Sequence, residues 1–328
     1  DVYKRQLQSG IGTGGSPGSF ALASSGIIGT ENTVGVRLLE VSLRSQTSLQ
    51  ISANIYSSII NLVPTVIPAA AGVVNNGSIW LNETPIPGLN SYSLDNAALG
   101  CLFANLLITD RIQIGDTTFT GDVAIGQAGG VAISASNLYF VGSPAAASLN
   151  RAVSFNAASG TALTFSPSVP GGLIQFDTGG RVFTRFGTAP VDIASSGGLI
   201  DFKRVTGVGQ SSSQPLNLDV SGILSSGSVA GNVFINNAGA LDFAGNFNMG
   251  ANVLSLTTGG SITQSVGGII TATGATPTVF NASGNDVTLD NNNNFGTVAF
   301  NSVRNASITD ANAIIFEAST LSGNFSAN

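Results

Sequence analysis

Short runs in which apolar and polar residues alternate recur along most of the chain, between clusters of Gly, Asn and Ser. A period of two places every second side chain on the same face, which is typical of a strand with one buried and one wet face. Gly, Asn and Ser favour turns because they tolerate positive φ or bond to their own backbone. Short strands that recur every ~8–12 residues predict an all-β sandwich, barrel or solenoid. The clearest runs are residues 216–220, 233–235, 241–243, 287–289, 298–300 and 306–308.

A Gly-Gly pair opens an expected strand six times and indicates an internal repeat. The pairs at residues 171 and 179 are eight residues apart, as are those at 259 and 267, and the two sets are offset by 88 residues, roughly four times 22. The gap from 179 to 197 fits this period less well. A repeat of about 20–22 residues is the coil length of a parallel β-helix. The pairs stand at 129–130, 171–172, 179–180, 197–198, 259–260 and 267–268, and their fourth positions are Ala132, Ile174, Val182, Ile200, Ile262 and Ile270.

The length of the chain favours this solenoid over the other all-β folds. A sandwich of 328 residues would divide into several domains, and no linker is visible, whereas a solenoid grows by adding coils. We therefore predict an all-β parallel β-helix that forms a single elongated domain, with less regular coils in residues 7–128 and more regular coils in residues 129–328. The asparagines at residues 291–294 suit a turn in which stacked amides form ladders between coils; a solvated loop is the alternative interpretation.

The first six residues, Asp-Val-Tyr-Lys-Arg-Gln, resemble a translated sequencing adaptor, and we exclude them from the fold argument. We then expect residue 7 to lie inside a longer protein. Without residues 1–6 the totals of 11 basic and 17 acidic residues fall by two and one, which leaves a net charge of −7. Lys203 is then the only lysine. Because nucleic acids and anionic membranes are bound through Lys and Arg, we expect this acidic chain to bind neither.

Two further features of the composition restrict the class of protein. Charged residues make up only 9% of the chain, but 43% of residues are apolar, so the chain can bury a core instead of remaining disordered. The most apolar stretch, residues 59–74, carries Pro64 and Pro68 and is too short to span a membrane, so we predict two buried strands there and no transmembrane segment. The single cysteine, Cys101, excludes an intramolecular disulfide and is expected to be a small buried apolar residue.

The chain contains no histidine, which excludes Ser-His-Asp and Cys-His nucleophiles and histidine-ligated zinc. We predict that the chain is not an enzyme and has no cofactor. Charges gather between residues 177 and 204, where coil spacing would place Asp177 near Asp201, with Lys203 and Arg204 beside them. A cleft that cleaves polysaccharides with paired carboxylates is the alternative interpretation. We favour a surface ladder of opposite charges, worth about 0–1 kcal/mol for each pair.

Asp286 and Asp290 are the candidates for a metal site. Their carboxylates and the asparagines that follow are the hard oxygen ligands that calcium prefers. The spacing matches no known calcium loop, so we predict that the chain holds no metal.

Four segments of the C-terminal hundred residues share a cadence of short strands and turns. They are Gly-Ser-Ile-Thr-Gln-Ser at residues 260–265, Ser-Gly-Asn-Asp-Val-Thr-Leu-Asp at 283–290, Asn-Phe-Gly-Thr-Val at 294–298 and Ser-Ile-Thr-Asp-Ala at 307–311. This style of repeat resembles the passenger region of filamentous-haemagglutinin-like exoproteins of bacteria. Weaker echoes, such as Gly-Ile-Gly-Thr at residues 10–13, extend further towards the N-terminus.

The resemblance implies a right-handed parallel β-helix that an outer-membrane transporter of the two-partner type exports. It implies a secreted or cell-surface location and an adhesive role towards a receptor or glycan that the sequence does not name. The family's secretion domain, with its Asn-Pro-Asn-Gly motif, is not visible, so we expect this chain to be part of a shaft. A carbohydrate-active β-helix is the rival interpretation and requires a cleft of carboxylates and aromatics. A phage-tail or ice-binding solenoid would require flat ranks of threonine, whereas the threonines here are scattered.

Overall fold

The computed structural model describes residues 4–8, 20–22, 38–45, 49–52, 54–64, 78–83, 91–126, 129–144, 152–185 and 191–328. Within these residues the chain forms short strands and one helix of four residues, so the fold is all-β as predicted. Thirty strands join one sheet, and β2 and β4 pair separately. Every pairing between these strands is parallel, which is the pattern of a solenoid of stacked coils.

The strands of the N-terminal part are β1 (Lys4–Gln8), β2 (Phe20–Leu22), β3 (Leu38–Ser45), β4 (Leu49–Ile51), β5 (Ile55–Pro64), β6 (Ser78–Leu81), β7 (Ser91–Leu94), β8 (Leu102–Phe103), β9 (Arg111–Ile114) and β10 (Val123–Ile125), with α1 (Asn96–Leu99) after β7. The central strands are β11 (Val131–Ala135), β12 (Asn137–Val141), β13 (Val153–Phe155), β14 (Thr161–Pro167), β15 (Leu173–Asp177), β16 (Arg181–Thr184), β17 (Val191–Val205), β18 (Gly207–Val208), β19 (Leu216–Leu224) and β20 (Ser228–Val229). The C-terminal strands are β21 (Val233–Asn237), β22 (Leu241–Phe243), β23 (Phe247–Gly250), β24 (Leu254–Thr258), β25 (Ile262–Gln264), β26 (Ile270–Ala272), β27 (Thr278–Asn281), β28 (Val287–Phe295), β29 (Thr297–Asn301), β30 (Ala306–Asp310), β31 (Ile315–Phe316) and β32 (Phe325–Ala327).

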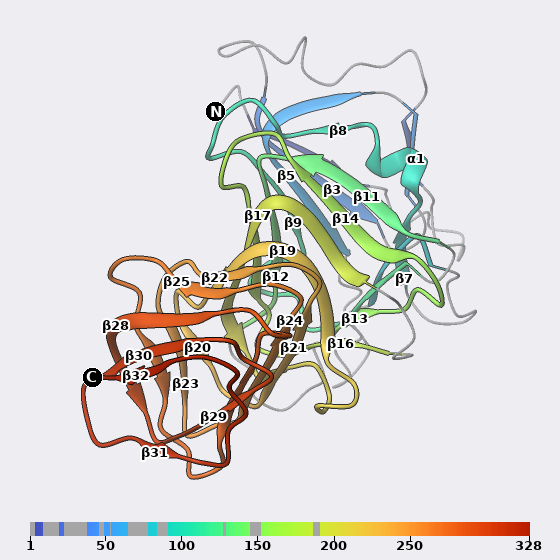
Figure 1. Cartoon of the computed structure of the whole chain (residues 1–328). Coiled ribbons are helices and arrows are strands. Elements are labelled where there is room, and N and C mark those ends of the chain that lie inside the picture. The colour runs from blue at the N-terminus through green and yellow to red at the C-terminus, as the bar shows by residue number, and fades with distance from the viewer. Residues whose placement is uncertain are drawn as a thin grey trace.

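Partner strands are separated in sequence by one circuit of the chain. Val233 of β21 pairs with Leu254 of β24, 21 residues later. Successive strands therefore do not pair with each other; each lies on the strand one coil earlier, and Figure 1 shows these strands following one another towards the red C-terminal coils. The circuit is not constant, because Leu138 of β12 pairs with Ile174 of β15, 36 residues later. Circuits in the central part are thus longer than the predicted 20–22 residues, and the additional residues lie in the connections because the strands remain short.

The apolar residues of the alternating runs form one continuous core cluster. In β19, Leu216, Leu218 and Val220 are buried, whereas the residues between them face outward, as the period of two predicts. Phenylalanine rings stack through this core from coil to coil. Ring centroids of neighbours lie 4.9 Å apart for Phe140 and Phe176, and 6.0 Å apart for Phe280 and Phe300. These separations are those of favourable aromatic pairs, so each coil is bound to the next through its interior.

The Gly-Gly pairs start strands because each glycine meets a different requirement. The first glycine of the pair at residues 171–172 has φ of 73°, a turn conformation that other residues rarely adopt. The second glycine approaches the neighbouring coil: a Cβ on Gly260 would lie 2.7 Å from the backbone nitrogen of Ala240. The fourth position is buried in five of the six pairs, and Ala132 is the exposed exception.

The last coil presents inward-facing positions to solvent. Phe316 pairs with Val298 and Phe325 pairs with Ala306, and both partners one coil earlier are buried. Phe316 and Phe325 are 38% and 47% exposed. Since Phe316 also stacks on buried Phe300 at 6.5 Å, the column of aromatic rings reaches the surface at this coil.

Three local expectations concern the N-terminal half. Residues 55–64 form β5, whereas residues 65–74 lie outside the described residues. Cys101 packs on the core but is partly exposed, because its thiol lies at the end of α1. Residues 4–8 form β1, which pairs with β3, and the adaptor-like character of residues 1–6 stays a prediction. No helix among the described residues is long and apolar enough to cross a membrane.

Candidate functional site

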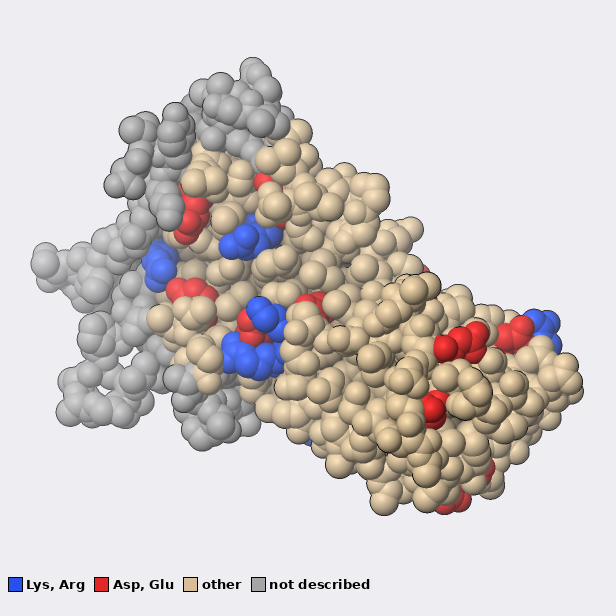
Figure 2. All heavy atoms as spheres, turned by 90° about the vertical axis from the view of Figure 1, so that its left-hand side faces the viewer, with Lys and Arg blue, Asp and Glu red and all other residues tan. Residues whose placement is uncertain are grey.

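The parallel register of β15 and β17 brings Asp177 together with two basic residues. Asp177 pairs with Arg204 across the two strands, and their side chains form an ion pair through Oδ1 and Nε. Lys203 Nζ lies 3.2 Å from Asp177 Oδ2. Arg204 also donates to the backbone carbonyl of Gly142 at 2.7 Å. Figure 2 shows how few ionisable residues this face carries and that blue and red groups lie beside one another.

Asp201 is fully engaged in the fold. It pairs with Gln175 rather than with Asp177, and only 1% of its surface is exposed. Its carboxylate accepts hydrogen bonds from Gln175 Nε2 at 2.8 Å, from Ser226 N at 2.8 Å and from Ser226 Oγ at 2.6 Å. A glycan-cleaving pair needs two carboxylates that face the substrate, and this arrangement gives Asp201 no such face.

The two carboxylates proposed for calcium hold the next coil. Arg304 donates to both oxygens of Asp286, at 2.8 and 2.7 Å, and Asn305 Nδ2 donates to Oδ1 at 2.9 Å. These hydrogen bonds from Arg304 and Asn305 hold the pKa of Asp286 well below its usual range. Asp290 accepts a hydrogen bond from Ser307 Oγ at 2.6 Å. Among the described residues, no three acidic, histidine or cysteine side chains gather to hold a metal ion.

The asparagine run forms neither the predicted ladder nor a solvated loop. Asn293 is completely buried, and its Nδ2 donates to the carbonyls of Leu289, Asn291 and Thr309. Its Oδ1 accepts from Gln264 Nε2 at 2.6 Å, a residue of the preceding coil. The amide therefore satisfies backbone groups at a corner of the coil, where buried carbonyls would otherwise lack partners.

A ladder of polar side chains instead runs along the outward face of β19, β21, β24, β27 and β29. The strand registers connect its members one coil at a time. The first rung carries a direct bond, since Asn236 Nδ2 donates to Asn217 Oδ1 at 3.1 Å. We call this set the polar ladder: Asn217, Asn236, Thr257, Asn281 and Asn301. Its members are separated by 19 to 24 residues, so only the pairing register reveals the alignment.

A buried acid lies beside the first member of the polar ladder. Asp192 Oδ2 accepts from the backbone N–H of Asn217 at 2.8 Å, and Oδ1 has no hydrogen-bond partner among the described residues. Burial raises the pKa of Asp192 to about 6, although hydrogen bonds from Asn217 and Thr184 oppose this shift. Burial is the larger effect because removing a carboxylate from water disfavours its charged form.

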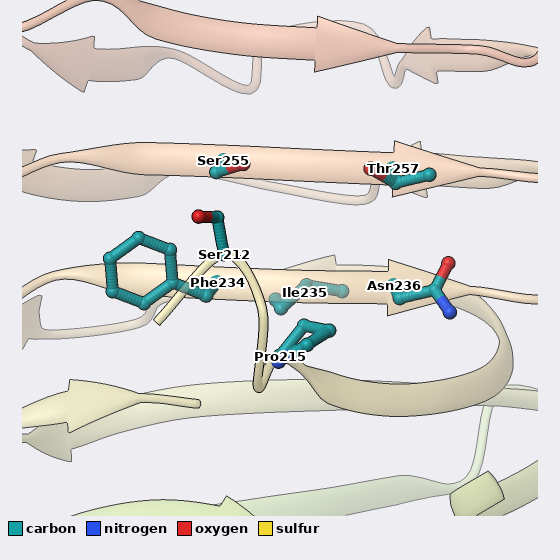
Figure 3. A pocket seen from close by; sticks show the side chains of 7 residues that line it. All are labelled: Ser212, Pro215, Phe234, Ile235, Asn236, Ser255 and Thr257. Atoms are coloured by element: carbon teal, nitrogen blue, oxygen red, sulfur yellow. The ribbon is translucent and has the colours of Figure 1, made fainter. Parts of the chain in front are cut away.

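A shallow pocket of about 250 Å³ lies on the same face (Figure 3). Ser212 and Pro215 come from the loop between β18 and β19, and this loop crosses in front of β21. The loop leaves β18 at Gly209, whose φ of 67° turns the chain over Phe234. None of the lining side chains is ionisable: Ser212, Pro215, Phe234, Ile235, Asn236, Ser255 and Thr257.

Comparison with known families gives one match, to repeats of unknown function (DUF5649), over residues 230–301. This chain resembles those repeats over that segment. The matched segment runs from the start of β21 to the end of β29 and therefore includes four of the five members of the polar ladder. No curated protein and no solved structure matches the chain.

Proposed function

We propose that this chain is a structural and adhesive segment of a large secreted fibre on a bacterial surface. In this proposal the stack is a right-handed parallel β-helix, with coils near 20–22 residues in the regular part. The resemblance of residues 260–311 to filamentous-haemagglutinin-like exoproteins supports this role. An outer-membrane transporter of the two-partner type would export the chain, and a receptor or glycan on another cell would be its target.

The stacking of the coils is the observation that carries the proposal. Each coil buries its inward side chains on its neighbour, and the core cluster continues from Val41 in β3 to Ile308 in β30. A stack of this kind extends by repetition and needs no closed sheet, so it suits a rod that holds a binding surface away from the cell. Short coils with few long connections also leave few exposed loops for proteases in the C-terminal part.

Surface display tests this function. The full chain is fused to an outer-membrane anchor on a non-adherent bacterium, and adhesion to epithelial cells and to other bacteria is counted against the anchor alone. We expect displayed chain to increase adhesion and to appear as a rod by electron microscopy. Equal adhesion with and without the chain overturns the adhesive role.

The same protein decides between adhesion and the rival catalytic interpretation. Purified chain is incubated with a panel of glycans, and new reducing ends and unsaturated products are measured. We expect no turnover. Turnover that Asp177→Asn or Asp201→Asn abolishes would replace the adhesive proposal with a carbohydrate-active β-helix.

A further inference from the structure

Two parallel rows of side chains line the outward face of β21, β24, β27 and β29. One is the polar ladder. The other row lies two residues earlier in each strand, and the same registers align it across the coils. It alternates a ring, a hydroxyl and aliphatic groups: Phe234, Ser255, Val279 and Ala299. We call the two rows together the two-row face. Because strands in a sheet lie about 4.8 Å apart, each row repeats at that interval along the stack.

The polar ladder offers both donors and acceptors on this face. An asparagine amide has two N–H donors and an accepting oxygen, and a threonine hydroxyl both donates and accepts. Asn236 uses one donor on Asn217, which leaves its oxygen facing outward, and Asn301 is exposed. The hydroxyls of a sugar likewise donate and accept. The ladder therefore matches a ligand that presents a hydroxyl or amide at each step along the stack.

The charge of the face restricts the ligand further. No lining residue of the pocket is ionisable, and neither row contains Lys, Arg, Asp or Glu. Sulfated, phosphorylated or uronic polymers are bound through cationic side chains, which this face lacks. The ring of Phe234 and the aliphatic side chain of Val279 instead offer apolar surface beside the polar ladder. A pyranose ring combines an apolar C–H face with polar edges, so a neutral sugar fits both rows at once.

The geometry favours a linear polymer over a compact ligand or a peptide strand. The two rows continue over four coils, whereas the pocket beside Ser212 covers only two of the strands, β21 and β24. A peptide strand would add to the edge of a sheet, where backbone groups are unpaired, and not to the face of paired strands. The loop that carries Ser212 and Pro215 forms a wall at one end of the two-row face (Figure 3).

We propose that the two-row face binds a linear neutral polysaccharide that lies along the axis of the coils. Its hydroxyls contact the polar ladder and its C–H faces rest on Phe234 and Val279. The inference rests on the proposed adhesive function and names the ligand class of that function. The face is shallow, so each sugar contributes little and binding strengthens with the number of coils that the polymer covers.

Affinity electrophoresis and calorimetry with defined polysaccharides test the inference. The probes are the neutral polymers mixed-linkage β-glucan, mannan and dextran, and the anionic polymers heparin and alginate. The variant Asn236→Ala/Thr257→Ala removes two polar contacts, and Phe234→Ala removes the ring. The control variant Thr288→Ala/Ser326→Ala removes outward hydroxyls of β28 and β32, on a different row of strands. Circular dichroism melts establish that each variant is folded.

We expect the chain to bind at least one neutral polymer and neither anionic one. The double variant should weaken binding about five- to hundredfold, since each lost hydrogen bond is worth about two- to tenfold. The control variant should bind like the unsubstituted chain. The inference is overturned if only anionic polymers bind, if no neutral polymer binds, or if the control and the double variant lose affinity equally.

The adhesion assay separates this inference from the proposed function. A displayed chain that adheres to cells without binding any neutral polymer keeps the function and overturns the ligand class. A chain that binds the polymer but adheres to nothing overturns the function and keeps the binding face.

Discussion

Replacing Asp192 with asparagine should stabilise the chain at neutral pH. Asp192 is buried, one of its oxygens has no hydrogen-bond partner among the described residues, and burial raises its pKa from 3.8 to about 6. Each pKa unit corresponds to about 1.4 kcal/mol, so the ionised carboxylate costs the folded state roughly 3 kcal/mol. Asparagine has the same shape and no charge, and its Oδ1 can accept the bond from Asn217 N. The Asp192→Asn variant should recover a large part of that cost.

The sign of the pH dependence follows from which state binds the proton. Between pH 4 and pH 6 the folded chain holds a proton on Asp192 and the unfolded chain does not. This residue's contribution to the free energy of unfolding therefore falls as pH rises through that window, and its cost is fully present above pH 6. The difference between the variant and the unsubstituted chain should be near zero at pH 4 and largest at pH 7.

Urea unfolding at pH 4, 5, 6 and 7 measures this difference. Asp219→Asn is the matched control, because Asp219 is an exposed carboxylate that lies one coil away and two residues past Asn217. The control should change the free energy of unfolding by less than about 0.5 kcal/mol at every pH. A variant at residue 192 that is no more stable at pH 7 than at pH 4, relative to the unsubstituted chain, refutes the assignment of a destabilising buried charge.

Three further predictions concern the core, the last coil and one ion pair. Phe280→Ala removes a buried ring between coils and should lower the free energy of unfolding by about 3–5 kcal/mol in urea titrations; a loss below 1 kcal/mol contradicts the aromatic column. Phe325→Asp should weaken concentration-dependent self-association in sedimentation experiments, because it charges the exposed apolar end, whereas the equally drastic Val266→Asp at a fully exposed position should not. Arg304→Ala should make the chain unfold at a higher pH on acidification, because the lowered pKa of Asp286 provides stability that is lost as pH falls; an unchanged acid midpoint argues against that pairing.

The class of fold could be predicted from local patterns because burial in a strand has a period of two. The alternation in residues 216–220 matches the burial of Leu216, Leu218 and Val220. The Gly-Gly pairs marked strand starts for a related reason, since a turn with positive φ followed by close approach of a neighbouring coil leaves glycine as the residue that fits. Both signals lie within a few residues of sequence.

The register between coils could not be predicted in the same way. Alternation states which face a residue occupies but not which coil lies beside it, and partner offsets depend on the length of each connection. Gln175, and not Asp177, therefore pairs with Asp201, and the polar ladder is invisible until Asn236 and Thr257 are placed in register. The burial of Asn293 was missed for another reason: its amide serves backbone carbonyls whose positions exist only in the folded coil.

The scarcity of charge in this chain follows from the stacking of its coils. Outward residues of the same type recur about 4.8 Å from one another along a rank, so a charged rank would place like charges at nearly that distance. Such a pair repels by about 1 kcal/mol in water and up to about 4 kcal/mol at the effective dielectric of a protein surface, and a rank accumulates that cost at every coil. Asparagine, serine and threonine avoid it and still hydrogen-bond between coils. The charges that remain include pairs of opposite sign across adjacent coils, as Asp177 with Arg204 and Asp286 with Arg304 show. The composition that first suggested a β-solenoid is therefore a consequence of its geometry, and it also leaves the two-row face neutral.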